Sequence, residues 1–167
     1  MLIVLGGLPA TGKTTIARLL SRRIRATHVR IDTIEQALRS SGSLTGDVGA
    51  AGYIVAHALA EDMLKLGQVV IADCVNPMAA TREAWRSIAA RADVPIMEVE
   101  LIRSDAADHR RHVEMRVPDV AGLPALTWDA VTSRPYEPWD RPHVIVDTSG
   151  RTAEQSVTEV VGALQRY

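Results

Sequence analysis

The chain has 167 residues, of which 47% are hydrophobic and 23% are charged, a composition typical of a globular protein with one buried core. The formal net charge is −1, so no overall positive field favours nucleic acid or anionic lipid. Cys74 is the single cysteine, which excludes an internal disulfide and a cysteine-based zinc site. No apolar run approaches a membrane span. We expect one soluble domain over residues 1–167, located in the reducing cytoplasm.

The chain opens with an apolar run, followed by a glycine-rich loop and then by a helical pattern. Residues Leu2–Leu5 predict a buried strand. Residues 7–14 read GLPATGKT and match the pattern G-x-x-x-x-G-K-[ST] in full. One face of the following helix is predicted by the spacing of Ile16, Leu19, Leu20 and Ile24. This order of strand, loop and helix favours a phosphate-binding loop over a chance glycine turn.

A loop of this kind binds a nucleoside triphosphate with its backbone. Its N–H groups and the helix N-terminus surround phosphate oxygens, which predicts ATP and Mg²⁺ as cofactors. Lys13 reaches the β- and γ-phosphates as a catalytic group, and the Thr14 hydroxyl binds the metal. The predicted nucleotide-binding residues of the loop are Gly7, Leu8, Pro9, Ala10, Thr11, Gly12, Lys13, Thr14 and Thr15.

The next apolar stretch, His28–Ile31, predicts a weaker strand that ends just before Asp32. In an open α/β sheet the carboxyl ends of the strands face the ligand crevice. Asp32 is therefore a candidate general base for an acceptor hydroxyl. Alternatively it caps a helix that begins at Thr33, and the two roles are compatible.

Residues Arg39–Gly49 are small and polar and predict a loop, and Val48–Leu66 predict a helix that is apolar around most of its circumference and buried on more than one side. The strand Val69–Ala72 follows and ends at Asp73. A carboxylate in this place is typical of a Walker B aspartate, which binds Mg²⁺ directly or through water. The alternative is a simple turn aspartate before Asn76-Pro77.

A helix with the apolar spacing of Trp85, Ile88, Ala89 and Ala92 leads to the predicted strand Ile96–Ile102. Beyond it, a basic helix over about 104–117 carries Arg110, Arg111 and Arg116. We expect a lid in which Arg110 binds the nucleotide and the other two stabilise the transferring phosphoryl group. The alternative is a solvated helix face on which Glu114 pairs with Arg110 or Arg111.

Residues Val117–Pro142 contain five of the eight prolines and predict an irregular segment around a short helix near Trp128–Ser133. The strand Val144–Val146 comes next, and a last helix has the spacing of Val157, Val160, Val161 and Leu164. Strands that alternate with helices indicate parallel pairing. The fold class is therefore α/β, a three-layer doubly wound parallel sheet.

Five stretches carry a family resemblance: GGLPATGKTTIARLL, RIDTIEQAL, VVIADCVNPMAATREAWRSIAARADV, EVELIRSDAADHRRHVEMR and SRPYEPWDRPHVIVDTSG. They resemble the small bacterial P-loop kinases of the zeta-toxin and polynucleotide-kinase-like group, an AAA-type ATP-binding family. The resemblance implies a strand order of 2-3-1-4-5, with Asp32 as general base and Asp73 at the metal. It also implies lid arginines among Arg110, Arg111 and Arg116, and places Asp147–Gly150 near the adenine base.

Three functions remain open for such a kinase-like chain. We expect an ATP- and Mg²⁺-dependent phosphotransferase that acts on a hydroxyl of a small molecule. The alternatives are a polynucleotide 5′-hydroxyl kinase and a nucleotide-binding switch or slow ATPase. Residues Ser40–Leu64, which by position cover the acceptor crevice, contain no Lys or Arg. This favours a compact, mainly neutral acceptor over a nucleic-acid end.

Overall fold

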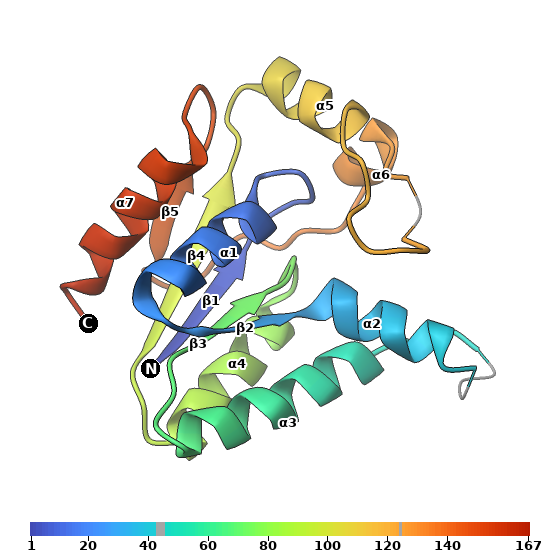
Figure 1. Ribbon diagram of the computed structural model, residues 1–167. Helices are drawn as coiled ribbons and strands as arrows, with labels where there is room; N and C mark the ends of the chain where they lie inside the picture. The colour runs from blue at the N-terminus through green and yellow to red at the C-terminus, as the bar shows by residue number, and fades with distance from the viewer. Residues whose placement is uncertain (43–45, 124) are drawn as a thin grey trace.

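The computed structural model describes residues 1–42, 46–123 and 125–167, and within them parallel strands form one sheet with helices on both faces (Figure 1). The strands are β1 (Leu2–Gly6), β2 (Thr27–Arg30), β3 (Val70–Asp73), β4 (Ile96–Ile102) and β5 (Val144–Asp147). The helices are α1 (Lys13–Ile24), α2 (Ile31–Ser40), α3 (Ala51–Lys65), α4 (Ala79–Arg91), α5 (Ala106–Glu114), α6 (Trp128–Thr132) and α7 (Ala153–Leu164). The order β2-β3-β1-β4-β5 confirms the predicted fold class and strand order. Within these residues no helix combines the length and the apolar character that a membrane crossing requires.

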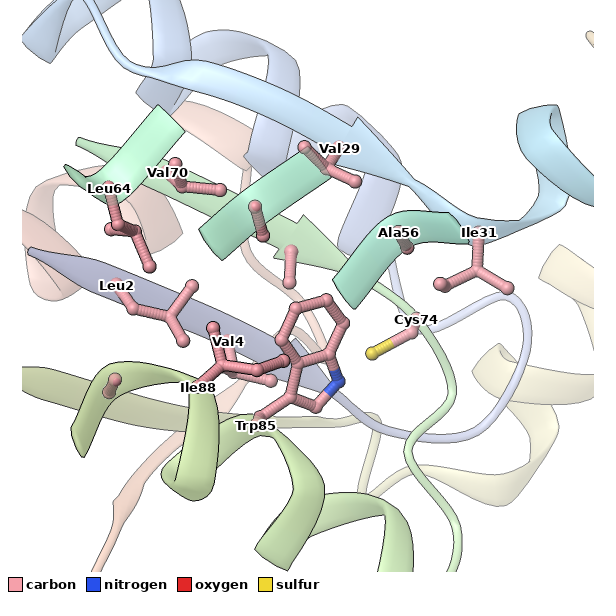
Figure 2. Packing of buried hydrophobic residues seen from close by; sticks show 13 residues of the cluster. Leu2, Val4, Val29, Ile31, Ala56, Leu64, Val70, Cys74, Trp85 and Ile88 are labelled. Atoms are coloured by element: carbon pink, nitrogen blue, oxygen red, sulfur yellow. The ribbon is translucent and has the colours of Figure 1, made fainter. Parts of the chain in front are cut away.

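Each face of the sheet has its own hydrophobic core. Leu2 and Val4 belong to a cluster with residues of α3 and α4, which Figure 2 shows gathered around the fully buried Trp85. Ile3 and Leu5 point the other way, into a cluster with residues of α1 and α7. Both faces of β1 are covered, and this explains why its sequence is continuously apolar rather than alternating.

The strand register brings the functional ends of the strands to one edge. Asp73, the last residue of β3, lies opposite Leu5 on one side and Arg30 on the other. Gly6 lies opposite Glu100 in β4. The loop that follows β1 and the helix that follows β2 therefore start at the same level as Asp73, and together they form the crevice of an open α/β sheet.

Two predictions about helices are wrong in detail. The second strand ends at Arg30, and Ile31 is the first residue of α2. As part of this helix, the Ile31 side chain still packs into the buried core. Asp32 thus lies in the first turn of α2 and does not cap it. Helix α3 is buried on one face only, since Ala56 is fully buried whereas Ile54 on the outer face is 65% exposed.

The segments predicted to surround the site have shifted boundaries. Part of the predicted loop Arg39–Gly49 is helical, because α2 continues to Ser40, and residues 43–45 lie outside the described residues. Helix α5 lies inside the predicted range of about 104–117, and it begins where the Asp105 side chain accepts hydrogen bonds from the N–H groups of Ala107 and Asp108. Between α5 and β5, the described residues are irregular apart from α6.

Candidate active site

The phosphate loop connects β1 to α1 and depends on glycine at two positions. Gly7 has φ +133°, and a Cβ there would clash with the carbonyl oxygen of Leu101. Gly12, at the N-cap of α1, has φ +94° and provides no side-chain cap. The first turn of α1 contains no acidic residue, so its N–H groups and its positive dipole end are available to an anion.

Lys13 is the charged group at the base of this loop. The residue is 8% exposed, and its Nζ donates a hydrogen bond to the Leu8 carbonyl oxygen at 2.7 Å. Burial lowers the pKa of Lys13 to about 8, although the nearby carboxylates of Asp73 and Asp32 act in the opposite direction. The ammonium group is thus held next to both candidate catalytic carboxylates.

Asp73 is a buried, ionised carboxylate. The residue is 4% exposed, and its Oδ2 lies 3.1 Å from Nε2 of His28. Burial alone would raise the pKa of Asp73, but the hydrogen bond with His28 and the charge of Lys13 hold it below its usual value. The Thr14 hydroxyl also donates to this carboxylate. A carboxylate beside a hydroxyl supplies the oxygen ligands that Mg²⁺ prefers, so these two residues fit the predicted metal.

Asp32 is more accessible than Asp73 and lines the same cavity. Its side chain is 40% exposed, and its Oδ2 lies 3.3 Å from Nη2 of Arg30 and 3.9 Å from Nη2 of Arg116. The cavity has a volume of about 1300 Å³. This exceeds the range of roughly 300–1,000 Å³ that is usual for one ligand, so the cavity offers room for a donor and an acceptor together.

The predicted lid arginines fall into two groups. Arg111 and Arg116 line the cavity, the former paired with Asp108 and the latter near Asp32. Arg110 is not among the lining residues, and its Nε contacts Oε1 of Glu114 at 2.7 Å on the exposed side of α5. The structure therefore does not bring Arg110 to the predicted nucleotide site. Its side chain pairs with Glu114 instead, as expected if this face of the helix is solvated.

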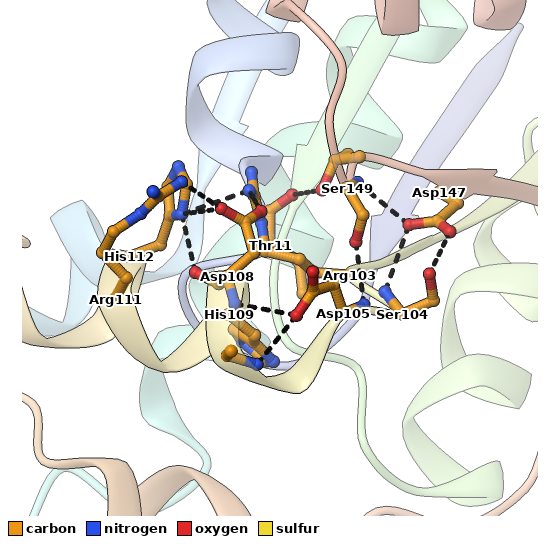
Figure 3. A network of polar contacts seen from close by, with 12 residues as sticks. Thr11, Arg103, Ser104, Asp105, Asp108, His109, Arg111, His112, Asp147 and Ser149 are labelled. Carbon is orange, nitrogen blue, oxygen red and sulfur yellow. Dashed lines mark hydrogen bonds and ion pairs between the residues drawn. The ribbon is translucent and has the colours of Figure 1, made fainter.

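Helix α5 is joined to the phosphate loop by a histidine that sequence reasoning left without a role. His109 is 6% exposed, and its Nε2 lies 2.8 Å from the carbonyl oxygen of Pro9. Its ring also contacts Trp128 of α6 edge-on, with the ring centroids 5.3 Å apart. Figure 3 shows His109 among the polar contacts of α5, with Asp108 bound to Arg111 and His112 on the same helix.

The loop after β5 also lies against the phosphate loop. The Thr148 hydroxyl donates to the carbonyl oxygen of Thr11 at 3.1 Å. Asp147 accepts hydrogen bonds from the N–H and hydroxyl groups of Ser104, just before α5 (Figure 3). Thr148 therefore lies beside the phosphate loop. The place near the adenine base that the family resemblance implies for residues 147–150 stays a prediction.

The expected roof of the acceptor crevice differs from the structure. From the stretch Ser40–Leu64, only Tyr53 is among the described residues that line the cavity. The other walls come from α2, from the residues after β3, and from the segments that flank α6. The cationic side chains that line the cavity are Lys13, Arg18, Arg30, Arg39, Arg111, Arg116 and Arg134, and the carboxylates are Asp32, Glu35, Asp73 and Asp119. The cavity is therefore richer in cations than the sequence suggested.

A parallel sheet of this order, with a G-x-x-x-x-G-K-T loop between its central strand and α1, defines a P-loop kinase. The chain belongs to the AAA domain family, which residues 2–138 match. Two similar proteins, both named probable adenylyl-sulfate kinase, come from Aeropyrum pernix and Pseudomonas aeruginosa. The first is 24% identical over 95% of this chain and 88% of its own length, and the second is 26% identical over 93% and 72%.

A solved structure of the APS kinase of Mycobacterium tuberculosis, in complex with AMPPNP and APS, superposes with a TM-score of 0.74. It is 20% identical and covers 98% of this chain and 96% of its own, and so it establishes a shared fold. The narrower assignment to the zeta-toxin and polynucleotide-kinase-like group stays a prediction.

Proposed function

We propose that this protein transfers the γ-phosphate of ATP to a hydroxyl group of a small-molecule acceptor. The observation that carries the proposal is the placement of Asp32, an accessible carboxylate in the same cavity as the buried pair Lys13 and Asp73. A switch protein needs a positioned water molecule at this place, whereas transfer to an alcohol needs a base near the acceptor. The arrangement therefore favours transfer over switching.

Each step has a residue of this chain to carry it. Asp32 accepts the proton of the acceptor hydroxyl as that oxygen attacks the γ-phosphorus atom, while the bond from this phosphorus to the β–γ bridging oxygen breaks and ADP leaves. Lys13 and the loop N–H groups hold the β- and γ-phosphates, while Arg111 and Arg116 stabilise charge on the transferring group. Thr14 and Asp73 would hold Mg²⁺, which would supply positive charge against the phosphates.

The acceptor side of the cavity, defined here by Asp32, Arg39, Tyr53, Met78 and Arg134, supports a compact acceptor with an anionic group. Tyr53 and Met78 provide apolar surface, and Arg39 is paired with Glu35 at 3.3 Å. Arg134 is exposed, and among the described residues no carboxylate lies within 4.0 Å of its guanidinium. An unpaired arginine in a binding cavity fits a carboxylate, sulfate or phosphate group. This revises the expectation of a mainly neutral acceptor.

The deciding experiment is transfer from labelled ATP to a panel of acceptors. Adenylyl sulfate is the first acceptor, because two similar proteins are named probable adenylyl-sulfate kinase. Sugar acids, neutral sugars and nucleosides follow. A 5′-hydroxyl oligonucleotide is included at two salt concentrations. We expect transfer to a small anionic acceptor. Efficient, strongly salt-dependent labelling of the oligonucleotide end would favour the polynucleotide kinase instead. ATP hydrolysis without any transfer would favour the slow ATPase.

A further inference from the structure

The segment that follows α5, residues 115–123, lines the cavity and is here called the strap. It has no regular secondary structure, and its apolar residue Val117 is 84% exposed. The strap runs from α5 towards α2 (Figure 1), where a Cβ at Gly122 would clash with the Gln36 side chain. The strap thus packs on the helix that carries Asp32.

One buried arginine binds the strap to the core. The side chain of Arg30 is 5% exposed, and its Nη1 and Nη2 donate to Oδ2 and Oδ1 of Asp119 in the strap, both at 2.9 Å. Arg18 of α1 adds a contact with Oδ2 of Asp119 at 2.6 Å. Two-pronged pairing between guanidinium and carboxylate is the strong form of this interaction. The hydrogen bond with Arg30 holds the pKa of Asp119 well below its usual range.

The same guanidinium faces the candidate catalytic carboxylates. Its Nη2 carries two hydrogens and donates to Oδ2 of Asp32 at 3.3 Å as well as to Asp119. Its Nε lies 3.9 Å from Oδ2 of Asp73 and is buried without a hydrogen bond. The Arg30 guanidinium therefore contacts Asp119, Asp32 and Asp73 at the same time.

We propose that Arg30 is a positioning residue that couples closure of the strap to the placement of Asp32. This inference rests on the proposed phosphotransfer function. With Asp119 bound, the guanidinium is fixed and holds the Asp32 carboxylate towards the cavity. The closed strap also brings Arg116 to 3.9 Å from Asp32. When Asp119 is released, Arg30 loses its two-pronged partner and Asp32 loses its fixed neighbour.

The test uses two variants. Asp119→Asn keeps the shape of the side chain and removes its charge. Arg30→Lys keeps the positive charge and removes the paired N–H groups that bind both oxygens of Asp119. Arg91→Gln is the matched control, because it breaks an exposed ion pair with Glu61, between α4 and α3. The first readout is amide hydrogen exchange of residues 115–123 in the nucleotide-free enzyme. We expect exchange about tenfold faster in both strap variants and unchanged exchange in the control.

The second readout is the ratio of acceptor-independent ATP hydrolysis to transfer. We expect both strap variants to lower kcat for transfer about tenfold and to raise this ratio, with ATP affinity within about twofold of the wild type. Unchanged exchange in Asp119→Asn would overturn the proposal, and this variant remains decisive if Arg30→Lys fails to fold. Faster exchange with an unchanged ratio would also overturn it. Absence of transfer by the wild-type enzyme would instead reject the proposed function, since the exchange readout does not depend on turnover.

Discussion

The donor side and the acceptor side of the cavity are built in different ways. The proposed donor side, residues 7–15 with Asp73, is mostly one uninterrupted stretch, in which backbone N–H groups act together with the side chains of Lys13 and Thr14. The acceptor side gathers single side chains from distant parts of the chain, such as Asp32 of α2 and Arg134 after α6. A phosphate site can be shared by many kinases because every triphosphate is alike, whereas the acceptor site must follow one molecule. Substitutions on the two sides should therefore affect different steps.

The largest effect is expected for Lys13→Met on the donor side. Removing this charge from the β- and γ-phosphates should lower the turnover number at least about a hundredfold. The fold should remain, because folding lowers the pKa of Lys13 to about 8 and the buried charge is itself unfavourable. Steady-state kinetics and thermal unfolding check both parts. A folded variant with near-normal turnover would contradict the role of the phosphate loop.

A pair of isosteric changes separates the two sides. Asp32→Asn should lower kcat about a hundredfold or more with ATP·Mg²⁺ affinity almost unchanged, because the proposed role of this carboxylate is to take the proton of the acceptor hydroxyl. Asp73→Asn should instead raise the Mg²⁺ concentration needed for binding and turnover. Calorimetric titration of ATP·Mg²⁺ into both variants measures the difference. Equal loss of nucleotide affinity in the two would show that this division of roles is wrong.

The arginines of α5 and the strap should differ according to the direction they face. Arg111→Ala and Arg116→Ala affect residues that line the cavity, and at least one should lower kcat about tenfold with a smaller change in ATP affinity. Arg110→Ala removes an exposed ion pair with Glu114 and serves as the matched control, within about twofold of the wild type. If kcat stays within about twofold of the wild type in all three variants, these side chains do not act on phosphate.

Arg134→Gln removes a cationic side chain from the proposed acceptor side. The KM for an anionic acceptor should rise about tenfold, since a charge-assisted hydrogen bond is lost, and the affinity for ATP should not change. A neutral hydroxyl compound turned over by the same enzyme should show no change in KM. A parallel rise for charged and neutral acceptors would mean that Arg134 only shapes the cavity.

The smallest effect concerns pH on the donor side. Since burial lowers the pKa of Lys13 to about 8, the free enzyme loses this charge as the pH rises through that value. Bound phosphate favours the charged form, so ATP·Mg²⁺ affinity should be about fourfold weaker at pH about 8.5 than at pH about 7. Lys13→Arg keeps its charge and should have a flat affinity profile over this range. A flat profile in the wild type would contradict the lowered pKa.

The fold class and the contiguous part of the proposed donor side could be predicted from the sequence alone. The phosphate loop is contiguous, so its pattern is complete within residues 7–14, and β1 and α1 flank it as predicted. Asp32 and Asp73 could be found because both follow apolar strands, and parallel strands end at the same edge. The one-residue shift at Ile31 arose because an apolar residue suits a buried strand and a buried helix start equally well.

The residues of the proposed acceptor side could be assigned only from the folded structure. Arg30 and Asp119 are 89 residues apart, and no periodicity predicts where an irregular segment such as the strap will meet the core. Arg110 and Arg111 are adjacent in the sequence but differ by about 100° around a helix, so rotation of α5 decides which one faces the cavity. The contact of His109 with Pro9 helps to fix that rotation. Because that contact joins residues 100 apart in the chain, the choice between the two arginines could not be made from the sequence.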